Sequence, residues 1–218
     1  MAKHYPSPNY DTIIEPFAGS AAYSLFGDNW QKNVILIEKD KQVGEIWEWL
    51  IEEATPSQIL GLPDLTIGEK SSEFFHIIHA ATKQAFKYKT IKVTPVLARN
   101  WEISKRVISA NLHKIKHWSL IVDDYTNAPN VPATWFIDPP YKDNAGLGYR
   151  HSSADLDYNS LADWVHSRQG EVICCEGASG DYLPFDKLLT LSSVAGKKST
   201  EKLYYASDVG QKQLALFA

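Results

Sequence analysis

The sequence predicts an α/β fold built on an open, mostly parallel sheet. Short apolar runs alternate along the chain with segments of helical periodicity, which is the pattern of strands joined by crossover helices. The runs are apolar on both faces, as buried parallel strands are, and several of them end in an acidic residue. With 218 residues, 44% of them hydrophobic and 22% charged, the chain is long enough for one such domain with a small insertion.

In the first half of the chain the expected strands and helices alternate. The expected order is a strand at 11–14, a helix at 21–26, a strand at 33–38 and a helix at 43–53. The first strand runs into a turn of small residues, and the second is an apolar run that ends in Glu38. The helix at 43–53 is expected to stop where Pro56 follows Thr55.

Residues 55–118 are less regular, and we expect them to form a mostly helical insertion. Helices are predicted at 72–87 and 100–117, with Pro95 breaking the pattern between them. Four apolar residues share one face of the second helix: Trp101, Ile108, Leu112 and Ile115. The basic residues of this helix are expected to lie away from that face: Lys105, Arg106, His113 and Lys114.

The second half of the chain returns to the alternating pattern. It is expected to hold strands at 119–122 and 134–137, a helix at 157–166, a strand at 171–175, and an antiparallel hairpin of 188–194 with 201–206. We therefore expect one domain over residues 1–207, interrupted by the insertion at 55–118, and a short tail at 208–218.

Positive charge is concentrated in one segment of a chain whose net charge is −4. Residues 80–118 contain nine basic residues and a single acid, Glu102, so this segment carries +8 and the rest of the chain −12. The nine are Lys83, Lys87, Lys89, Lys92, Arg99, Lys105, Arg106, Lys114 and Lys116. Such segregation favours a cationic face for a polyanion over the alternative of a solvated helix surface.

The composition disfavours several classes of protein. No apolar run reaches the roughly 18–20 residues of a membrane helix, and the N-terminal residues have no apolar signal-peptide core, so we expect a cytoplasmic protein without a membrane partner. The two cysteines, Cys174 and Cys175, are adjacent in an apolar run and are interpreted as core residues. The chain has no Cys/His spacing of a metal site, so no metal is expected.

Polar signals follow four of the expected strands at their carboxyl ends. They are the turn Glu15-Pro16-Phe17-Ala18-Gly19-Ser20-Ala21, the acid Glu38, the pair Asp123-Asp124, and the motif Asp138-Pro139-Pro140-Tyr141. In an open parallel sheet, ligands bind at this edge. Each signal alone has a structural explanation, such as a helix cap, but four in register predict one binding crevice.

The first two signals predict a nucleoside-like cofactor. Small residues in the turn let a ligand approach the backbone, and Glu38, 19 residues beyond Gly19, is placed to bond ribose hydroxyls. The turn lacks the G-x-G-x-x-G spacing of a pyrophosphate cradle. A nucleoside cofactor without a pyrophosphate therefore fits better than NAD.

The motif at residues 138–141 predicts chemistry on a flat amino group. Its prolines stiffen the backbone and remove two N–H donors. The carboxylate of Asp138 and a proline carbonyl can both accept hydrogen bonds from a planar amino group, which raises the electron density on its nitrogen. Tyr141 offers a face on which a base stacks, and a base within a duplex must be flipped out to reach such a pocket.

These two motifs, in this order, resemble those of the Dam-like class of N6-adenine-specific DNA methyltransferases, and the resemblance covers about residues 5–207. It implies a Rossmann-like S-adenosylmethionine-dependent methyltransferase fold and direct methyl transfer from S-adenosylmethionine to N6 of adenine in double-stranded DNA. The catalytic residues that it implies are Asp138, Pro139, Pro140 and Tyr141. The cofactor-binding residues that it implies are Tyr5, Glu15, Pro16, Phe17, Ala18, Gly19, Ser20, Ala21, Glu38, Asp123, Asp124, Tyr125 and Asp138, with Asp124 favoured over Asp123 as the acid that meets the cofactor's adenine.

The sequence departs from the family pattern in two places. The Gly/Lys motif near the N-terminus is reduced to Lys3 and Tyr5. The target-recognition insertion is short, although it contains the whole +8 segment, so we expect a short or relaxed target sequence and salt-dependent binding. The expected DNA-binding residues are Lys83, Lys87, Lys89, Lys92, Arg99, Lys105, Arg106, Lys142 and Arg150.

Two further segments carry expectations. The glycine-containing loop 142–151 suits a lid that orders on DNA binding, and its two cations either contact phosphates or are ordinary loop charges. The terminal residues Gln213-Leu214-Ala215-Leu216-Phe217 resemble the pentapeptide that docks bacterial proteins onto the sliding clamp, with packing on the protein's own domain as the alternative. We expect a monomer or a weak dimer.

Two other functions remain open from the sequence. A related motif serves other amino groups, so the substrate is alternatively an RNA base, or cytosine N4 in DNA. The chain is alternatively a catalytically inactive relative that binds nucleic acid, although intact Glu38 and Asp138 argue against this.

Overall fold

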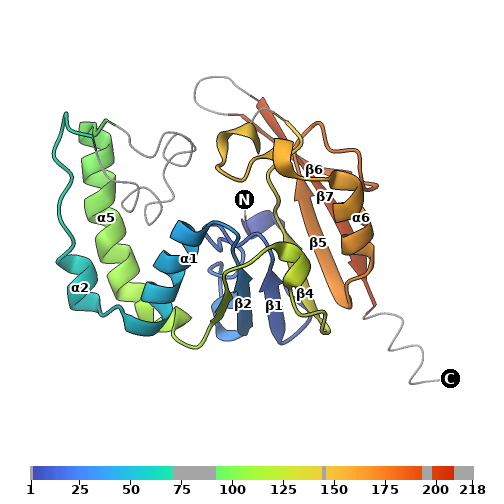
Figure 1. Ribbon diagram of the computed structural model, residues 1–218, viewed down its shortest axis with the longest axis horizontal. Helices are drawn as coiled ribbons and strands as arrows, with labels where there is room; N and C mark the ends of the chain where they lie inside the picture. The colour runs from blue at the N-terminus through green and yellow to red at the C-terminus, as the bar shows by residue number, and fades with distance from the viewer. Residues whose placement is uncertain (1, 71–91, 144–145, 193–197, 209–218) are drawn as a thin grey trace.

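The computed structural model has a seven-stranded sheet at its centre, with packed cores on both of its faces (Figure 1). It describes residues 2–70, 92–143, 146–192 and 198–208. The strands are β1 (Thr12–Glu15), β2 (Asn33–Ile37), β3 (Ser119–Ile121), β4 (Ala133–Ile137), β5 (Gly170–Glu176), β6 (Asp186–Ser192) and β7 (Lys198–Ser207). Their order in the sheet, β3-β2-β1-β4-β5-β7-β6, confirms the predicted α/β architecture.

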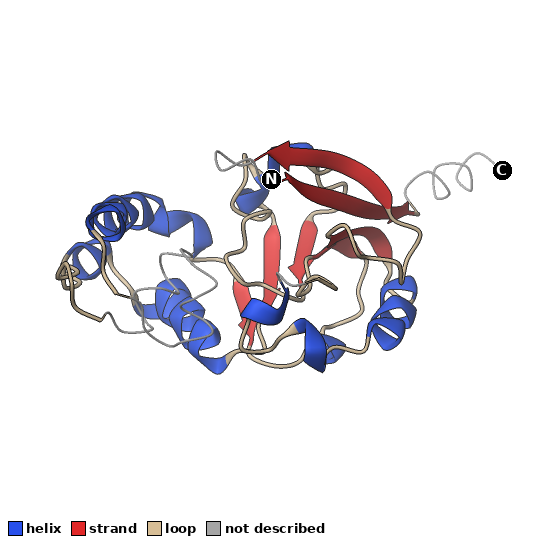
Figure 2. Cartoon of the chain, turned by 90° about the horizontal axis from the view of Figure 1, so that it is seen from above, coloured by secondary structure: helices blue, strands red, loops and turns tan. Residues whose placement is uncertain are grey.

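Strands β1 to β5 run parallel to one another, and β7 is antiparallel to both β5 and β6. The first five have the strand order 3-2-1-4-5 of dinucleotide-binding sheets, so the sheet is compatible with a Rossmann-like fold. The predicted hairpin is confirmed, and Figure 2 shows its two long strands at one edge of the sheet. Residues 193–197, which join them, lie outside the described part of the chain.

Helices connect the strands and form the insertion. The main ones are α1 (Lys41–Glu48), its π-helical continuation η3 (Trp49–Glu53), α2 (Pro56–Leu60), α5 (Pro95–Asn111), η4 (Leu112–Ile115) and α6 (Tyr158–His166). Short 3-10 turns are η1 (Ala2–His4), η2 (Asn29–Gln31), η5 (Tyr125–Asn127), η6 (Gly146–Gly148) and η7 (Ser153–Asp155). Among the described residues, no helix combines the length and the apolar character needed to cross a membrane.

Consecutive residues of the central strands enter opposite faces of the sheet, which is why these strands are apolar throughout. Ile13 packs in the core that contains α1, and Ile14 in the core that contains α6. The adjacent cysteines divide in the same way, Cys175 to the first core and Cys174 to the second. Both thiols are buried and free, which confirms the prediction that they are core residues.

The segment 21–26 does not form the predicted helix. It is a series of turns, and Ala21 has a φ of 48°, which lies outside the helical range. The backbone N–H of Ser24 donates to the buried carboxylate of Glu15 at 2.8 Å instead of to a carbonyl one helical turn earlier. A side-chain acceptor at the end of β1 thus replaces a helical hydrogen bond.

The helix expected at 100–117 begins earlier, at Pro95, and its last turn is the 3-10 segment η4. Proline suits the first helical turn, where its missing N–H leaves no hydrogen bond unmade. The side chain of Thr94 caps this end by accepting from the N–H of Leu97 at 3.2 Å. Pro95 therefore starts the helix rather than breaking it. The helix predicted at 72–87 lies outside the described residues.

Lys105 lies on the inner side of α5, which corrects the prediction that it points away from the apolar face. Only 4% of the residue is exposed. Its ammonium pairs with Asp64 and, at 2.8 Å, with Glu102, and it donates to the carbonyl oxygen of Leu62 at 3.1 Å. The lysine ties α5 to the segment after α2, so its assignment as a DNA contact is wrong. A long apolar stem lets a charged residue occupy a core position, which helical periodicity does not reveal.

We predict that Lys105→Met lowers the free energy of unfolding by about 1–2 kcal/mol. The variant removes the charge-assisted hydrogen bonds of the ammonium group and leaves their acceptors without this donor. Urea unfolding measures this change. The matched control is Arg106→Met on the exposed side of the same helix, which should leave stability within about 0.5 kcal/mol of the wild type. Equal stability of the two variants would contradict the structural role of Lys105.

Candidate active site

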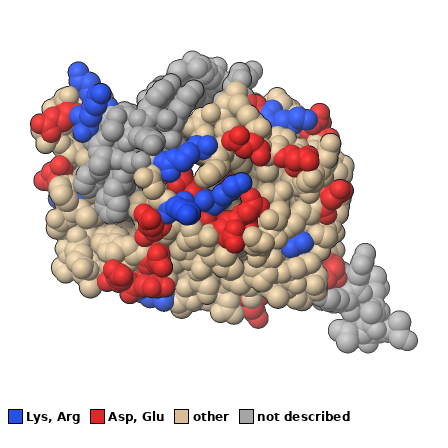
Figure 3. Space-filling view, viewed as in Figure 1, with Lys and Arg blue, Asp and Glu red and all other residues tan. Residues whose placement is uncertain are grey.

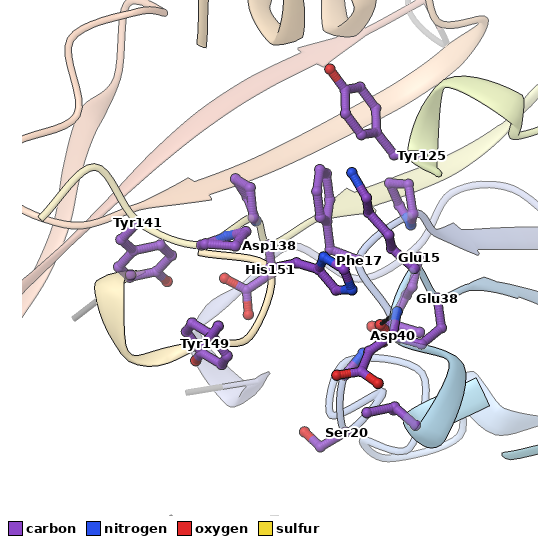
Figure 4. Close-up of a pocket in the computed structure, with 18 of the residues that line it drawn as sticks. Glu15, Phe17, Ser20, Glu38, Asp40, Tyr125, Asp138, Tyr141, Tyr149 and His151 are labelled. Atoms are coloured by element: carbon purple, nitrogen blue, oxygen red, sulfur yellow. Dashed lines mark hydrogen bonds between the residues drawn. The ribbon is translucent and has the colours of Figure 1, made fainter. Parts of the chain in front are cut away.

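A cavity of about 420 Å³ opens at the carboxyl ends of the parallel strands (Figure 4). It is lined by residues that follow β1, β2, β3 and β4, so the structure brings the four predicted signals together. The predicted residues that line it are Tyr5, Glu15, Pro16, Phe17, Ala18, Gly19, Ser20, Glu38, Asp124, Tyr125, Asp138, Pro139, Pro140 and Tyr141. Two predicted residues do not line it: Ala21, which is fully buried, and Asp123, which is exposed and accepts from the N–H of Asp124 at 2.7 Å.

Glu38 and Gly19 join the turn after β1 to the loop after β2. One carboxylate oxygen of Glu38 accepts from the N–H of Gly19 at 2.9 Å, and the other accepts from the N–H of Asp40 at 2.9 Å. Gly19 has a φ of 47°, a backbone conformation that favours glycine, and its carbonyl accepts from the indole of Trp47 at 2.9 Å. Burial raises the pKa of Glu38 to about 7, although the two backbone donors act to lower it.

Glu15 is a second carboxyl group with a raised pKa at this site. It is the last residue of β1 and is 2% exposed. Burial raises its pKa to about 7, while hydrogen bonds from Ser24 lower it and the charge of Asp138 raises it. Its carboxylate also holds the turn after β1, because it accepts from the backbone of Ser24. Glu15 thus has a structural task in addition to its place in the cavity wall.

Asp138 follows β4, and its side chain is exposed to the cavity. Figure 4 shows it with Tyr141 and Tyr149 on one side and with Phe17 and Glu38 toward the other. The carbonyl oxygen of Pro140 accepts from the hydroxyl of Tyr158 at 2.6 Å. The second proline carbonyl of the motif is therefore engaged within the protein, which leaves the carbonyl of Pro139 as the better candidate acceptor for a ligand.

Asp124 follows β3 and lines the cavity next to Tyr125. Partial burial acts to raise the pKa of Asp124, but hydrogen bonds from Thr126 and the ion pair with Lys39, at 2.9 Å, outweigh it and lower the pKa. Beside Asp124, the rings of Phe17 and Tyr125 stack with their centres 5.1 Å apart. A charged acceptor and the ring of Phe17, which stacks on Tyr125, suit the edge and one face of a heterocyclic base.

The loop 146–156 overlaps the segment 142–151 in which a lid was expected, and it closes one side of the cavity with residues that were not predicted individually. These lining residues are Gly146, Tyr149, His151, Ser152, Asp155 and Leu156. The loop is held down by Arg150, which pairs with the carboxylate of Asp40 at 2.6 Å and donates to Gln42 at 2.6 Å. Spacing gave no signal for these residues, because their place depends on how the loop folds back over the strand ends.

The expected DNA-binding cations have different environments. Lys83, Lys87 and Lys89 lie outside the described residues, whereas Lys92, Arg99 and Arg106 are exposed. Lys142 pairs with Asp181 at 2.7 Å, and Arg150 pairs with Asp40 at 2.6 Å, so each of these cations has an acidic partner in its own chain. Figure 3 shows basic and acidic side chains interleaved around the centre of one face. The described residues of that face form no continuous basic patch.

No protein-family model matches the chain, and a search of curated proteins gives no match. Within the described ranges, no group of three or more His, Cys, Asp or Glu side chains is arranged to hold a metal ion. The clamp-like residues 213–217 lie outside the described part of the chain.

We predict that Glu15→Gln stabilises the protein relative to the wild type above pH 7 but not below pH 4.5. The folded pKa of Glu15 is about 7, above its ordinary value of 4.5. Between these values the folded state binds the proton more tightly, so the wild type loses stability as pH rises through this window. The gain of the variant at pH 8 should be on the order of 1–3 kcal/mol.

Urea unfolding at pH 4.5, 6 and 8 measures this difference. Glu45→Gln, at an exposed position of α1, is the matched control and should show a difference from the wild type that does not change with pH. A constant difference for Glu15→Gln as well would mean that the carboxyl group ionises normally in the folded protein.

Proposed function

We propose that this protein transfers a methyl group from S-adenosylmethionine to the N6 amino group of adenine in DNA. The observation that carries the proposal is the convergence of Asp138, Tyr141, Glu38 and the turn 15–20 on one cavity at the carboxyl ends of parallel strands. These segments are distant in the sequence, and the resemblance to Dam-like methyltransferases assigns all of them to one reaction. The strand order and the closing hairpin are compatible with the methyltransferase fold that the resemblance implies.

The charge of the cavity supports a cationic cofactor without phosphate groups. Seven of its lining residues are acids: Glu15, Glu38, Asp40, Asp124, Asp138, Asp155 and Glu201. Lys39 is the one lysine or arginine among the described lining residues, and it is paired with Asp124. Such a surface repels a pyrophosphate and attracts a sulfonium ion. S-Adenosylmethionine, when bound, supplies an electrophilic methyl group whose carbon–sulfur bond breaks toward the sulfur.

The residues at the two ends of the cavity fit this ligand. Glu38 would accept from the ribose hydroxyls, as the resemblance implies, and Asp124 with Phe17 and Tyr125 would hold the adenine. The turn 15–20 would contact the methionine and ribose portions. None of these assignments requires a phosphate-binding loop, which agrees with the absence of G-x-G-x-x-G spacing in the turn.

Asp138 would act on the substrate amino group. Its carboxylate and the carbonyl of Pro139 accept the two amino hydrogens, which keeps the nitrogen lone pair available for attack on the methyl carbon. As the nitrogen–carbon bond forms, the nitrogen becomes acidic, and Asp138 can take one of its protons. The face of Tyr141 would support the flat ring, and Tyr149 lies near the same carboxylate.

The substrate is tested by incubating the protein and S-adenosylmethionine with DNA or RNA and then measuring modified nucleosides by mass spectrometry. N6-Methyl-2′-deoxyadenosine from DNA supports the proposal, whereas methylated deoxycytidine or a methylated ribonucleoside from RNA identifies one of the alternative substrates. Calorimetry with S-adenosylmethionine tests the inactive alternative, because an inactive relative that lost the cofactor site shows no binding.

We predict that Asp138→Ala lowers the rate of methyl transfer at least about 100-fold. The variant lacks the carboxylate that accepts a hydrogen bond from the reacting amino group and then takes its proton. The affinity for S-adenosylmethionine should change by less than about threefold, since the carboxylate acts on the substrate. Tritium transfer from labelled cofactor measures the rate, and calorimetry measures the affinity. Asp123→Ala changes an acid that follows β3 and does not line the cavity, so it is the matched control and should retain the wild-type rate. Methylation at the wild-type rate by Asp138→Ala would refute the assignment.

A further inference from the structure

Glu201 is a buried acid in β7 that the sequence motifs do not assign to any task. It is 7% exposed and lines the cavity beside the motif at residues 138–141. Its Oε1 atom accepts from the hydroxyl of Tyr141 at 2.7 Å and from the hydroxyl of Tyr5 at 2.5 Å. One oxygen atom therefore joins the N-terminal segment, the end of β4 and the C-terminal hairpin.

Both tyrosine hydroxyls keep their protons and act as donors in this cluster. Burial raises the pKa of Tyr141 well above its ordinary value, and the charges of Asp138 and Glu201 raise it further. Burial has the same effect on Tyr5, whose ring also packs edge-on against Phe136 with centres 5.1 Å apart. Tyr141 is therefore unsuited to take a proton at neutral pH, and the task left to it is to present its ring.

We infer that Glu201 is a positioning residue, which holds the ring of Tyr141 in the orientation that the flat substrate needs. The inference rests on the proposed function, because it concerns the surface against which the base would stack. The two prolines before Tyr141 stiffen the backbone that leads into it, but the ring of Tyr141 can still turn about its side-chain bonds. The hydroxyl bond to Glu201 fixes the far end of the ring, and Tyr5 holds the carboxylate from its other side.

This position of Glu201 follows from the alternation of β7. Glu201 and Leu203 are two residues apart and so face the same side of the sheet. Leu203 packs against the core that also contains Phe136, with Tyr141 at its edge. An acid therefore occupies a position where the strand otherwise presents an apolar side chain. Burying a carboxylate there is unfavourable unless donors satisfy it, and Tyr5 and Tyr141 supply two.

A double-mutant cycle tests the inference. Glu201→Ala and Tyr141→Phe remove the same hydrogen bond from its two ends, so each should lower the single-turnover rate of methyl transfer about 10-fold. The double variant should also be about 10-fold slower than the wild type, instead of about 100-fold slower, because the second change has no bond left to remove. Glu201→Gln keeps an oxygen acceptor and should retain the rate within about threefold.

Tyr205→Phe is the matched control. The hydroxyl of Tyr205, also in β7, donates to the buried carboxylate of Glu171 in β5 at 2.8 Å, away from the cavity. This variant loses the same kind of bond as Tyr141→Phe, so it should lose a similar amount of stability in urea but keep the wild-type transfer rate. A general destabilising effect would slow both variants equally and would overturn the inference.

Three other outcomes also overturn it. The first is multiplicative rate losses in the double variant. The second is a Glu201→Gln variant as slow as Glu201→Ala, which would assign the effect to charge. The third is weaker binding of S-adenosylmethionine to Glu201→Ala but not to Tyr141→Phe, which would make the carboxylate a cofactor contact. A wild-type protein that methylates no nucleic acid refutes the proposed function instead, and urea unfolding of the same four proteins still reports whether positions 141 and 201 are coupled.

Discussion

The cavity depends on the carboxylate of Glu38, which bonds the two loops that form its floor. Parallel strands β1 and β2 end side by side, so the residues after them are brought together but are not yet ordered by the sheet. Glu38 orders both, because one of its oxygens accepts from Gly19 and the other from Asp40. Asp40 then caps α1 by accepting from the N–H of Gln42 at 3.0 Å and also pairs with Arg150 of the loop over the cavity. One half-buried acid thus orders the turn, the helix start and, through Asp40, the closing loop.

The parts of the fold that local sequence determines were predicted well. An apolar run that ends in an acid is a short-range pattern, and the residues that have this pattern form β1, β2 and β4. The cavity residues next to these strands follow directly, because parallel strands place their carboxyl ends along one edge. What the sequence did not reveal depends on contacts between distant segments. Residues 21–26 form turns in which the N–H of Ser24 donates to the side chain of Glu15. Helical propensities do not account for such a side-chain acceptor.

Contacts within the chain also explain why counting basic residues overestimates the charge available to a partner. A count of charges treats every lysine as available to a partner, but Lys105 is neutralised inside the insertion and Lys116 donates to the carbonyl oxygens of Leu50 and Ala54 at 3.0 and 2.8 Å. These cations stabilise helix ends and loops of their own chain. The +8 charge of the segment 80–118 is therefore an upper limit on the charge that it presents to a polyanion. Arg99 and Arg106, exposed on one side of α5, are better candidates for that contact.

The acids that line the cavity affect which charge a ligand can carry. Glu15 and Glu38 have pKa values of about 7 because burial disfavours their charged forms. Ionising both in the empty cavity therefore costs free energy, and a cation placed among them recovers part of that cost, whereas an anion increases it. A cavity lined by such acids therefore favours a cationic ligand over an anionic one. This preference supports the proposed cofactor, which carries a sulfonium charge.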